Sequence, residues 1–260
     1  LLSTPAAAPG YRSGTLGMAL SAPARGPAST STPTPAAPSA SGEPTPGALV
    51  VRHALEAMRV AIAGAEEELG RLDAIVGDGD HGAGMARGTE AAVAAAGTAT
   101  TAAGALTGAG AAFGDAAGGA SGALWGAGLL AMGRTLGERT PRSCPGVTDI
   151  RAALVEALAV IQRLGGASVG DRTLVDALAP FVDAFPSDGA SLADAWDAAL
   201  PAMRSAVDAT AQLMPRKGRA TVHGEHALGT VDAGARSLGI ALEAVGEVLR
   251  ASQRDAGDGS

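Results

Sequence analysis

The stretch ALVVRHALEAMRVAIAGAEEELGRLD, residues 48–73, decides the fold class of this chain. Its apolar side chains recur at helical spacing, which places them broadly on one side of a long amphipathic helix. These positions are Leu49, Val50, Leu55, Met58, Val60, Ile62 and Leu69. Further helical segments are expected at about 85–96, 101–117, from 119 onward, 148–164, 171–184, 191–213 and 231–251, separated by Gly, Pro or Asp-Gly. We therefore predict an all-α fold of about eight helices, without strands.

The composition limits the class of protein. The chain has 260 residues, 47% of them hydrophobic and only 2% aromatic, so its core is built from small side chains, which favours helices. A net charge of −7 without a basic stripe argues against nucleic acid as a partner. A single cysteine, Cys144, excludes an internal disulfide and fits a reducing cytoplasm. No apolar run reaches the roughly 18 residues of a membrane span, and the start lacks a secretion signal. We expect a cytoplasmic protein without a membrane partner.

Three regions are expected along the chain. Residues 1–46 are dominated by Pro, Ala, Ser and Thr, as in STSTPTPAAPSASGEPTPG at 29–47, which is typical of a disordered linker. Residues 47–252 carry the helical pattern and form the predicted domain, and residues 253–260 are expected to be a flexible tail. The chain does not begin with Met, so we expect a piece of a longer protein.

The loop LDAIVGDGDHG, residues 72–82, holds three carboxylates, Asp73, Asp78 and Asp80. Carboxylates this close repel one another unless a cation lies among them. The glycines at 77, 79 and 82 allow a tight turn that directs the carboxylates inward. Oxygen ligands alone favour Mg²⁺ or Ca²⁺ over zinc. The alternative is a solvated acidic turn.

Three more glycine-containing segments lie at expected helix starts. GGASG at 118–122 offers backbone amides and a serine hydroxyl, an arrangement suited to phosphate, although tight packing also explains it. In VGDRTLVDAL at 169–178, Asp171 is a candidate helix cap and Thr173 a candidate contact back toward the turn, although capping alone also explains the segment. The segment GRATVHGEHALGTVDAGA at 218–235 contains Arg219 and two histidines before the last helix. A metal loop together with several anion sites is typical of a nucleotide site.

The ordered segments LDAIVGDGDHGAGMARG, GGASGALWGAG, GDRTLVDALAPF and GRATVHGEHALGTVDAGA resemble the nucleotide-binding, DhaL-type domain of dihydroxyacetone kinases. The resemblance covers about residues 47–252. Such domains occur fused in ATP-dependent kinases and as the separate L subunit of the phosphotransferase-dependent enzyme. The start, LLSTPAAAPG, weakly resembles the end of the preceding substrate-binding domain. The resemblance implies an antiparallel barrel of eight amphipathic helices.

The resemblance also implies site residues. Asp73, Asp78 and Asp80 would hold two Mg²⁺ ions that bridge nucleotide phosphates. The implied nucleotide contacts are His81, Gly84, Ala120, Ser121, Gly170, Thr173, Ala179, Arg219, Asp232, Ala233 and Gly234. Ala120 and Ser121 would cradle phosphate. This chain departs from the family pattern in having Gly84 for asparagine, Arg172 for lysine and Ala233 for proline.

The implied function is that of an ATP- and Mg²⁺-binding phosphoryl-donor domain that transfers the γ-phosphoryl group to dihydroxyacetone or a related short ketose. The family captures its substrate on a histidine of another domain. We therefore assign no catalytic residue here, and neither His223 nor His226 is a candidate nucleophile. One alternative is an L subunit with tightly bound ADP that a phosphocarrier protein rephosphorylates. Another is a non-catalytic nucleotide-sensing module that docks on a regulator.

Overall fold

A computed structural model of the chain describes residues 42–140, 144–188, 191–218, 221 and 224–258. The described part is helical and contains no strand, which confirms the all-α prediction. Its elements are α1 Pro46–Gly64, α2 Glu66–Ala74, α3 His81–Ala96, α4 Ala102–Ala117, α5 Gly119–Arg139, α6 Val147–Gly165, α7 Leu174–Ala184, α8 Leu192–Ala209, η1 Thr210–Gln212, α9 Gly224–Ala227 and α10 Ala233–Asp258. No helix in this part is both long and apolar enough to cross a bilayer.

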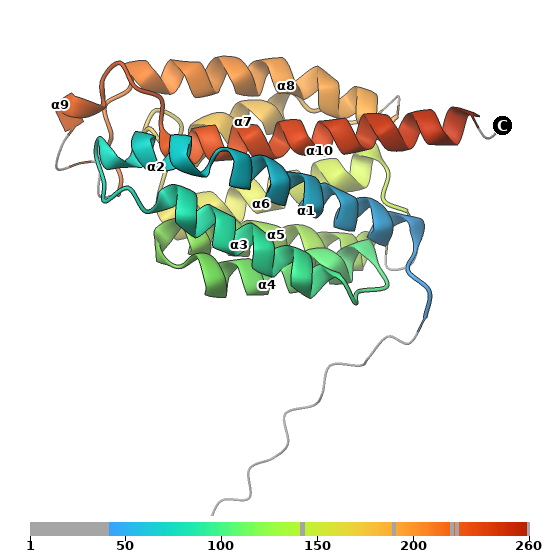
Figure 1. Ribbon diagram of the computed structural model, residues 1–260. Coiled ribbons are helices and arrows are strands. Elements are labelled where there is room, and N and C mark those ends of the chain that lie inside the picture. Colours follow the sequence, from blue (N-terminus) through green and yellow to red (C-terminus); the bar gives the residue numbers. More distant parts are fainter. Residues whose placement is uncertain (1–41, 141–143, 189–190, 219–220, 222–223, 259–260) are drawn as a thin grey trace, which may run out of the picture. The chain divides into compact units, whose positions relative to one another are not determined.

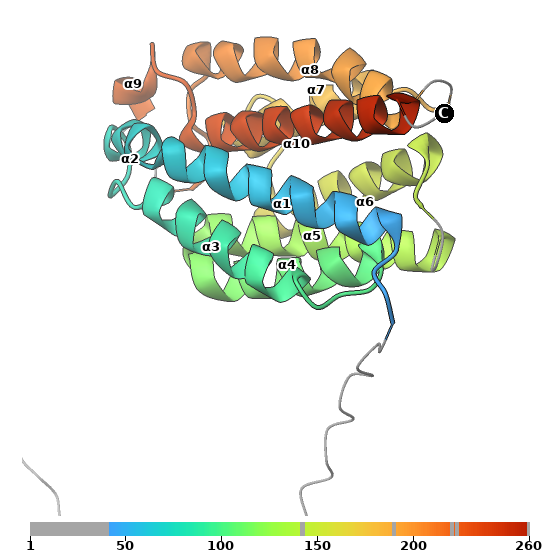
Figure 2. The same ribbon diagram turned by 45° about the vertical axis from the view of Figure 1, so that its right-hand side comes forward.

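The longer helices close into a ring. Helix α1 packs on α3, and the ring continues through α4, α5, α6, α7 and α8 to α10, which packs back on α1. Two views show this arrangement, with α2 and α9 at one end of it (Figures 1 and 2). The predicted eight-helix antiparallel barrel is therefore confirmed, with α2 and α9 as short additions.

The predicted single helix over residues 48–73 is wrong in one respect, because it breaks at Ala65 into α1 and α2. Ala65 has φ −105° and ψ 5°, outside the helical region. Leu69 anchors α2 in the core with no exposed surface, and Arg236 of α10 pairs with Glu68 at 2.8 Å. Gly82 brings the start of α3 so close to α2 that a Cβ there would overlap the carbonyl oxygen of Glu66. The break thus sets the position of the aspartate loop.

Small residues let helices approach closely. Between α4 and α5, a Cβ added to Gly126 would lie 2.7 Å from the carbonyl oxygen of Gly110. Beside this contact Phe113 and Trp125 stack with ring centroids 5.6 Å apart. A separate aromatic cluster of Phe181, Phe185 and Trp196 fills the space between α7 and α8. The aromatic residues of the described part are therefore concentrated in the core, beside many closely packed small residues.

Two helices end at residues other than the predicted ones. Helix α10 continues to Asp258, past the predicted end at residue 251, and includes most of the segment expected to be a tail. Helix α8 ends at Ala209 and is followed by η1, whereas one helix over 191–213 was expected. Residues 1–41, most of the expected linker, lie outside the described part, so the linker remains a prediction.

Candidate functional site

A cavity of about 700 Å³ lies where the starts of α3, α5, α7 and α10 meet the end of α2. Its polar wall comes from the aspartate loop, the α4–α5 junction and the residues before α7 and α10. An apolar wall comes from Leu124, Ile161 and Leu164. The sequence segments singled out above therefore converge on one site, since each of them contributes to this lining.

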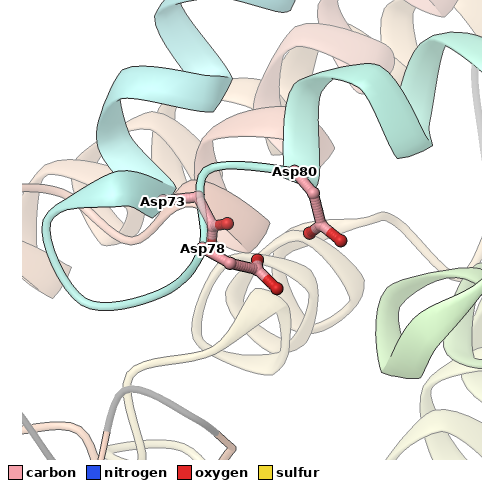
Figure 3. A group of neighbouring side chains, drawn as sticks. All are labelled: Asp73, Asp78 and Asp80. Atoms are coloured by element: carbon pink, nitrogen blue, oxygen red, sulfur yellow. The ribbon is translucent and has the colours of Figure 1, made fainter.

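The aspartate loop forms a carboxylate cluster. Asp73, Asp78 and Asp80 each offer an oxygen, and these oxygens lie within 4.8 Å of one another. Figure 3 shows the three side chains on one side of the loop between α2 and α3. Asp73 and Asp80 also line the cavity. Three closely placed carboxylates form the donor set that hard divalent cations such as Mg²⁺ prefer, so the residues present fit that ion.

Glycines make the loop possible. The Gly79 amide donates to Oδ2 of Asp73 at 2.9 Å, and Gly79 has φ +77°, in the left-handed region. The Gly77 amide donates to the carbonyl oxygen of Asp73 at 2.6 Å. A Cβ at Gly77 would lie 2.6 Å from Oδ1 of Asp73, so a side chain there would displace this carboxylate. The local sequence thus fixes the Asp73 carboxylate relative to the turn that carries the other two.

The start of α5 forms another part of the cavity wall. Gly118 and Gly119 have φ +69° and +60°, which turns the chain sharply before Ala120 and Ser121, and both of these line the cavity. No side chain caps this helix start. The first amides of a helix have no intrahelical acceptors and carry partial positive charge. The arrangement therefore suits an anionic group.

His81 begins α3 and is only 8% exposed. Its Nε2 lies 2.9 Å from Oγ of Ser237, and its Nδ1 lies 3.3 Å from Oγ of Ser121. Gly84 follows one turn later and also lines the cavity. The structure thus brings His81, Gly84, Ala120 and Ser121 together, as the sequence implied.

The start of α7 differs from the expectation that Asp171 caps it. The cap is Thr173, whose Oγ1 accepts from the Val175 amide at 3.1 Å. Asp171 instead accepts from the Ser168 amide, and Asp176 accepts from the Thr173 amide at 2.8 Å. The junction is therefore stabilised by the Thr173 cap together with the turn that Asp171 closes, whereas a cap by Asp171 was predicted.

Of the implied nucleotide contacts Gly170, Thr173 and Ala179, only Thr173 lines the cavity. The Gly170 amide donates to Oδ1 of Asp176 at 2.5 Å, and Ala179 is a buried core residue of α7. Gly170 and Ala179 are not among the residues that line the cavity.

Asp232, Ala233 and Gly234 line the cavity at the start of α10. Asp232 caps this helix, because its Oδ2 accepts from the Ala235 amide at 2.8 Å. Burial raises the pKa of Asp232 to about 6, while the Ala235 amide and the charge of Arg172 act against this shift. Arg219 and His223 lie outside the described residues, so their place in the site remains a prediction.

Two cationic residues of the lining, Arg172 and Lys217, were not predicted. Arg172 is 3% exposed, has φ +61°, and donates from Nη2 to the carbonyl oxygens of Thr230 at 2.8 Å and Ala227 at 3.3 Å. Burial lowers the pKa of its guanidinium. In the sequence, only the departure from lysine at position 172 singled out Arg172. No local pattern singled out Lys217.

Comparisons with known proteins identify the family of this chain. Residues 75–247 match the DAK2 domain family. The chain is 42% identical to D-erythrulose kinase of Mycolicibacterium smegmatis over 213 residues, 79% of this chain and 36% of that protein. It is 43% identical to L-erythrulose kinase of Pectobacterium atrosepticum over 222 residues, 82% of this chain and 37% of that protein. The chain thus spans little more than a third of the length of these curated relatives.

A shorter relative and a solved structure add to this. The ADP-binding subunit DhaL of the PTS-dependent dihydroxyacetone kinase of Lactococcus lactis is 32% identical over 183 residues, which cover 70% of this chain and 87% of that subunit. The crystal structure of dihydroxyacetone kinase from C. freundii in complex with AMP-PNP and Mg²⁺ superposes with a TM-score of 0.64 at 26% identity, over 87% of this chain and 38% of that one. The chain therefore belongs to the dihydroxyacetone kinase family, as a DAK2 domain of the DhaL type.

Proposed function

We propose that this chain binds ATP or ADP with Mg²⁺ and acts as the phosphoryl-donor domain of a kinase for dihydroxyacetone, erythrulose or a related short ketose. The observation that carries this proposal is the shared cavity, whose lining combines Asp73 and Asp80 of the carboxylate cluster with the start of α5. Such a combination suits a metal-bound polyphosphate, since the carboxylates would hold the cation and the helix amides would bind the anion. The names of the erythrulose kinases and of the ADP-binding subunit support it.

In this proposal the three aspartates are ligands of two Mg²⁺ ions and neither donate nor remove protons. Bound Mg²⁺ supplies neutralisation of the charge that develops on the transferred phosphoryl group. Ala120 and Ser121 hold phosphate, with His81 and Gly84 beside them. Thr173 is the proposed contact from α7, and Asp232, Ala233 and Gly234, with Arg219, border the nucleotide.

The acceptor ketose is proposed to arrive on a separate substrate-binding domain, because the chain corresponds to only about a third of the related kinases. Large apolar side chains are exposed in the cavity lining, at Leu164, and on segments next to it, at Val169, Met214 and Leu228, and they suit docking of that domain. Adding such a domain should start ketose-dependent ADP formation from ATP, which the chain alone should not perform.

A second candidate is an ADP-carrying subunit that a phosphocarrier protein rephosphorylates. The observation in its favour is that this chain covers 87% and 93% of the DhaL subunits of Lactococcus lactis and Listeria innocua. Release of nucleotide separates the two candidates. Protein that retains ADP through gel filtration supports the subunit, whereas ready exchange with free ATP supports the ATP-dependent kinase, which the higher identity to erythrulose kinases favours.

Calorimetry tests the metal and nucleotide assignment. Binding of ATP and ADP is measured with and without Mg²⁺ for the wild type and for the double variant Asp78→Ala, Asp80→Ala. We expect Mg²⁺-dependent binding that this variant loses. The matched control is Asp183→Ala with Asp188→Ala, which removes two exposed carboxylates outside the cavity. Equal affinity of wild type and double variant for Mg-ADP would refute the metal assignment.

A further inference from the structure

A line of hydrogen bonds joins α10 to the cavity wall through His81. Ser237, on α10, is completely buried, and its Oγ lies 3.0 Å from the carbonyl oxygen of Gly234 and 2.9 Å from Nε2 of His81. On the far side of the same imidazole ring, Nδ1 lies 3.3 Å from Oγ of Ser121. The line therefore connects α10, α3 and α5, although Ser237 itself does not line the cavity.

The direction of each hydrogen bond follows from counting protons. A hydroxyl has a single proton, and Ser237 donates its proton to the carbonyl oxygen of Gly234. This arrangement assigns Nε2 of His81 as the donor to Oγ of Ser237. In the neutral tautomer with its proton on Nε2, Nδ1 has a lone pair, to which the Ser121 hydroxyl 3.3 Å away can donate.

We infer that Ser237 is a positioning residue for the cavity. Ser237 selects the tautomer and ring orientation of His81, and His81 in turn selects the rotamer of Ser121. The two residues that it controls line the cavity. Because Ser237 is fully buried on another helix, it can act on a bound ligand only through them. That the ligand is a nucleotide rests on the function proposed above.

The consequence concerns the start of α5. Ser121 lies in the first turn of that helix, where backbone amides have no intrahelical acceptors. A Ser121 hydroxyl tied to His81 occupies one position beside these amides, so an incoming phosphate meets a wall that is already ordered. Preorganisation of this kind raises affinity because fewer side-chain conformations are lost on binding.

The tautomer is measurable in nucleotide-free protein. Ring ¹⁵N chemical shifts of His81, recorded at about pH 8.5, above the usual imidazole range, report which nitrogen carries the proton. A His81→Gln variant identifies the signals among the four histidines. We expect a proton on Nε2 in the wild type and a mixture of tautomers in Ser237→Ala. A wild-type proton on Nδ1, or an unchanged tautomer in Ser237→Ala, would overturn the inference.

Affinity gives the second measurement. Ser237→Ala should weaken Mg-ADP binding by about twofold to tenfold, the range of one hydrogen bond's net contribution. The control is Thr89→Val on α3, which removes another buried hydroxyl that donates to helix carbonyls but does not contact His81. Equal losses in both variants would mean that Ser237 contributes only packing.

If Ser237→Ala does not fold, Ser237→Cys keeps the volume with a weaker hydrogen-bonding group. If the wild type itself fails to bind Mg-ADP, the proposed function is refuted, while the ¹⁵N shifts still decide the role of Ser237.

Discussion

Arg172 and Asp232 form a pair in the cavity lining, with Nη1 of the guanidinium 3.8 Å from Oδ1 of the carboxylate. Their side chains are only 2% and 15% exposed. The separation exceeds a normal hydrogen bond, so the pair attracts without a direct contact. Each group also has a structural partner, since Arg172 donates to the carbonyl oxygens before α10 and Asp232 caps that helix. The pair thus joins the segment before α7 to the segment before α10.

The raised pKa of Asp232 predicts a pH dependence of stability. Its folded pKa is about 6, compared with a usual value of 3.8, so between these pH values the folded state keeps a proton that the unfolded chain has lost. The free energy of unfolding therefore falls as pH rises through this window, and the cost persists at neutral pH. A shift of this size corresponds to about 3 kcal/mol at most.

Asp232→Asn tests this dependence, because an amide oxygen can still cap α10 but carries no charge. Urea unfolding of variant and wild type is compared at about pH 4, near the lower end of the window, and at about pH 7, above it. We expect the stability of the variant relative to the wild type to rise between these pH values by about 2–3 kcal/mol. The control Asp183→Asn removes an exposed carboxylate from α7. A relative stability of Asp232→Asn that does not change with pH would contradict the shift.

Two substitutions of Arg172 distinguish the contribution of its charge to stability from that of its hydrogen bonds. Arg172→Met leaves the carbonyls of Ala227 and Thr230 without this donor, and we expect it to lower the free energy of unfolding by about 2–4 kcal/mol. Arg172→Lys keeps the charge and should lose less, about 1–2 kcal/mol. Denaturant unfolding measures both. A Lys variant as unstable as the Met variant would show that the forked geometry, rather than the charge, matters.

Most of the fold and the polar half of the site could be predicted from the sequence, because both depend on local patterns. Apolar spacing identified the helices, and the glycines around Asp78 identified a turn that brings carboxylates together. The break at Ala65, the capping by Thr173 and the burial of Arg172 could not be read in this way. Each depends on contacts between distant segments, such as the 2.8 Å bond from Arg172 to Thr230. Ser237 and His81 are 156 residues apart in the sequence, so no local pattern indicates the hydrogen bond between them.

Gly82 should tolerate no side chain, because its Cβ would overlap the carbonyl oxygen of Glu66. We expect Gly82→Ala to lower the free energy of unfolding by about 2–4 kcal/mol and to weaken Mg-ADP binding, since the start of α3 carries Asp80 and His81 away from their places. The matched control is Gly64→Ala at the end of α1, where a Cβ meets open space. That variant should be neutral or slightly stabilising, by up to about 1 kcal/mol. Equal stabilities of the two variants in urea unfolding would contradict the close approach.

Gly84 offers a test of what the departure from asparagine does in this chain. A Cβ at this position would lie 3.2 Å from the carbonyl oxygen of Ala117, so the neighbouring backbone must shift only slightly. Because Gly84 lines the cavity, the amide of Gly84→Asn can reach a bound ligand. We expect this variant to fold and to bind Mg-ADP about threefold to tenfold more tightly, the gain of one added hydrogen bond. Calorimetry checks the affinity, and a melting temperature at saturating Mg-ADP that rises further than in the wild type supports it. Weaker binding by a folded Gly84→Asn would mean that the open space at residue 84 itself accommodates the nucleotide.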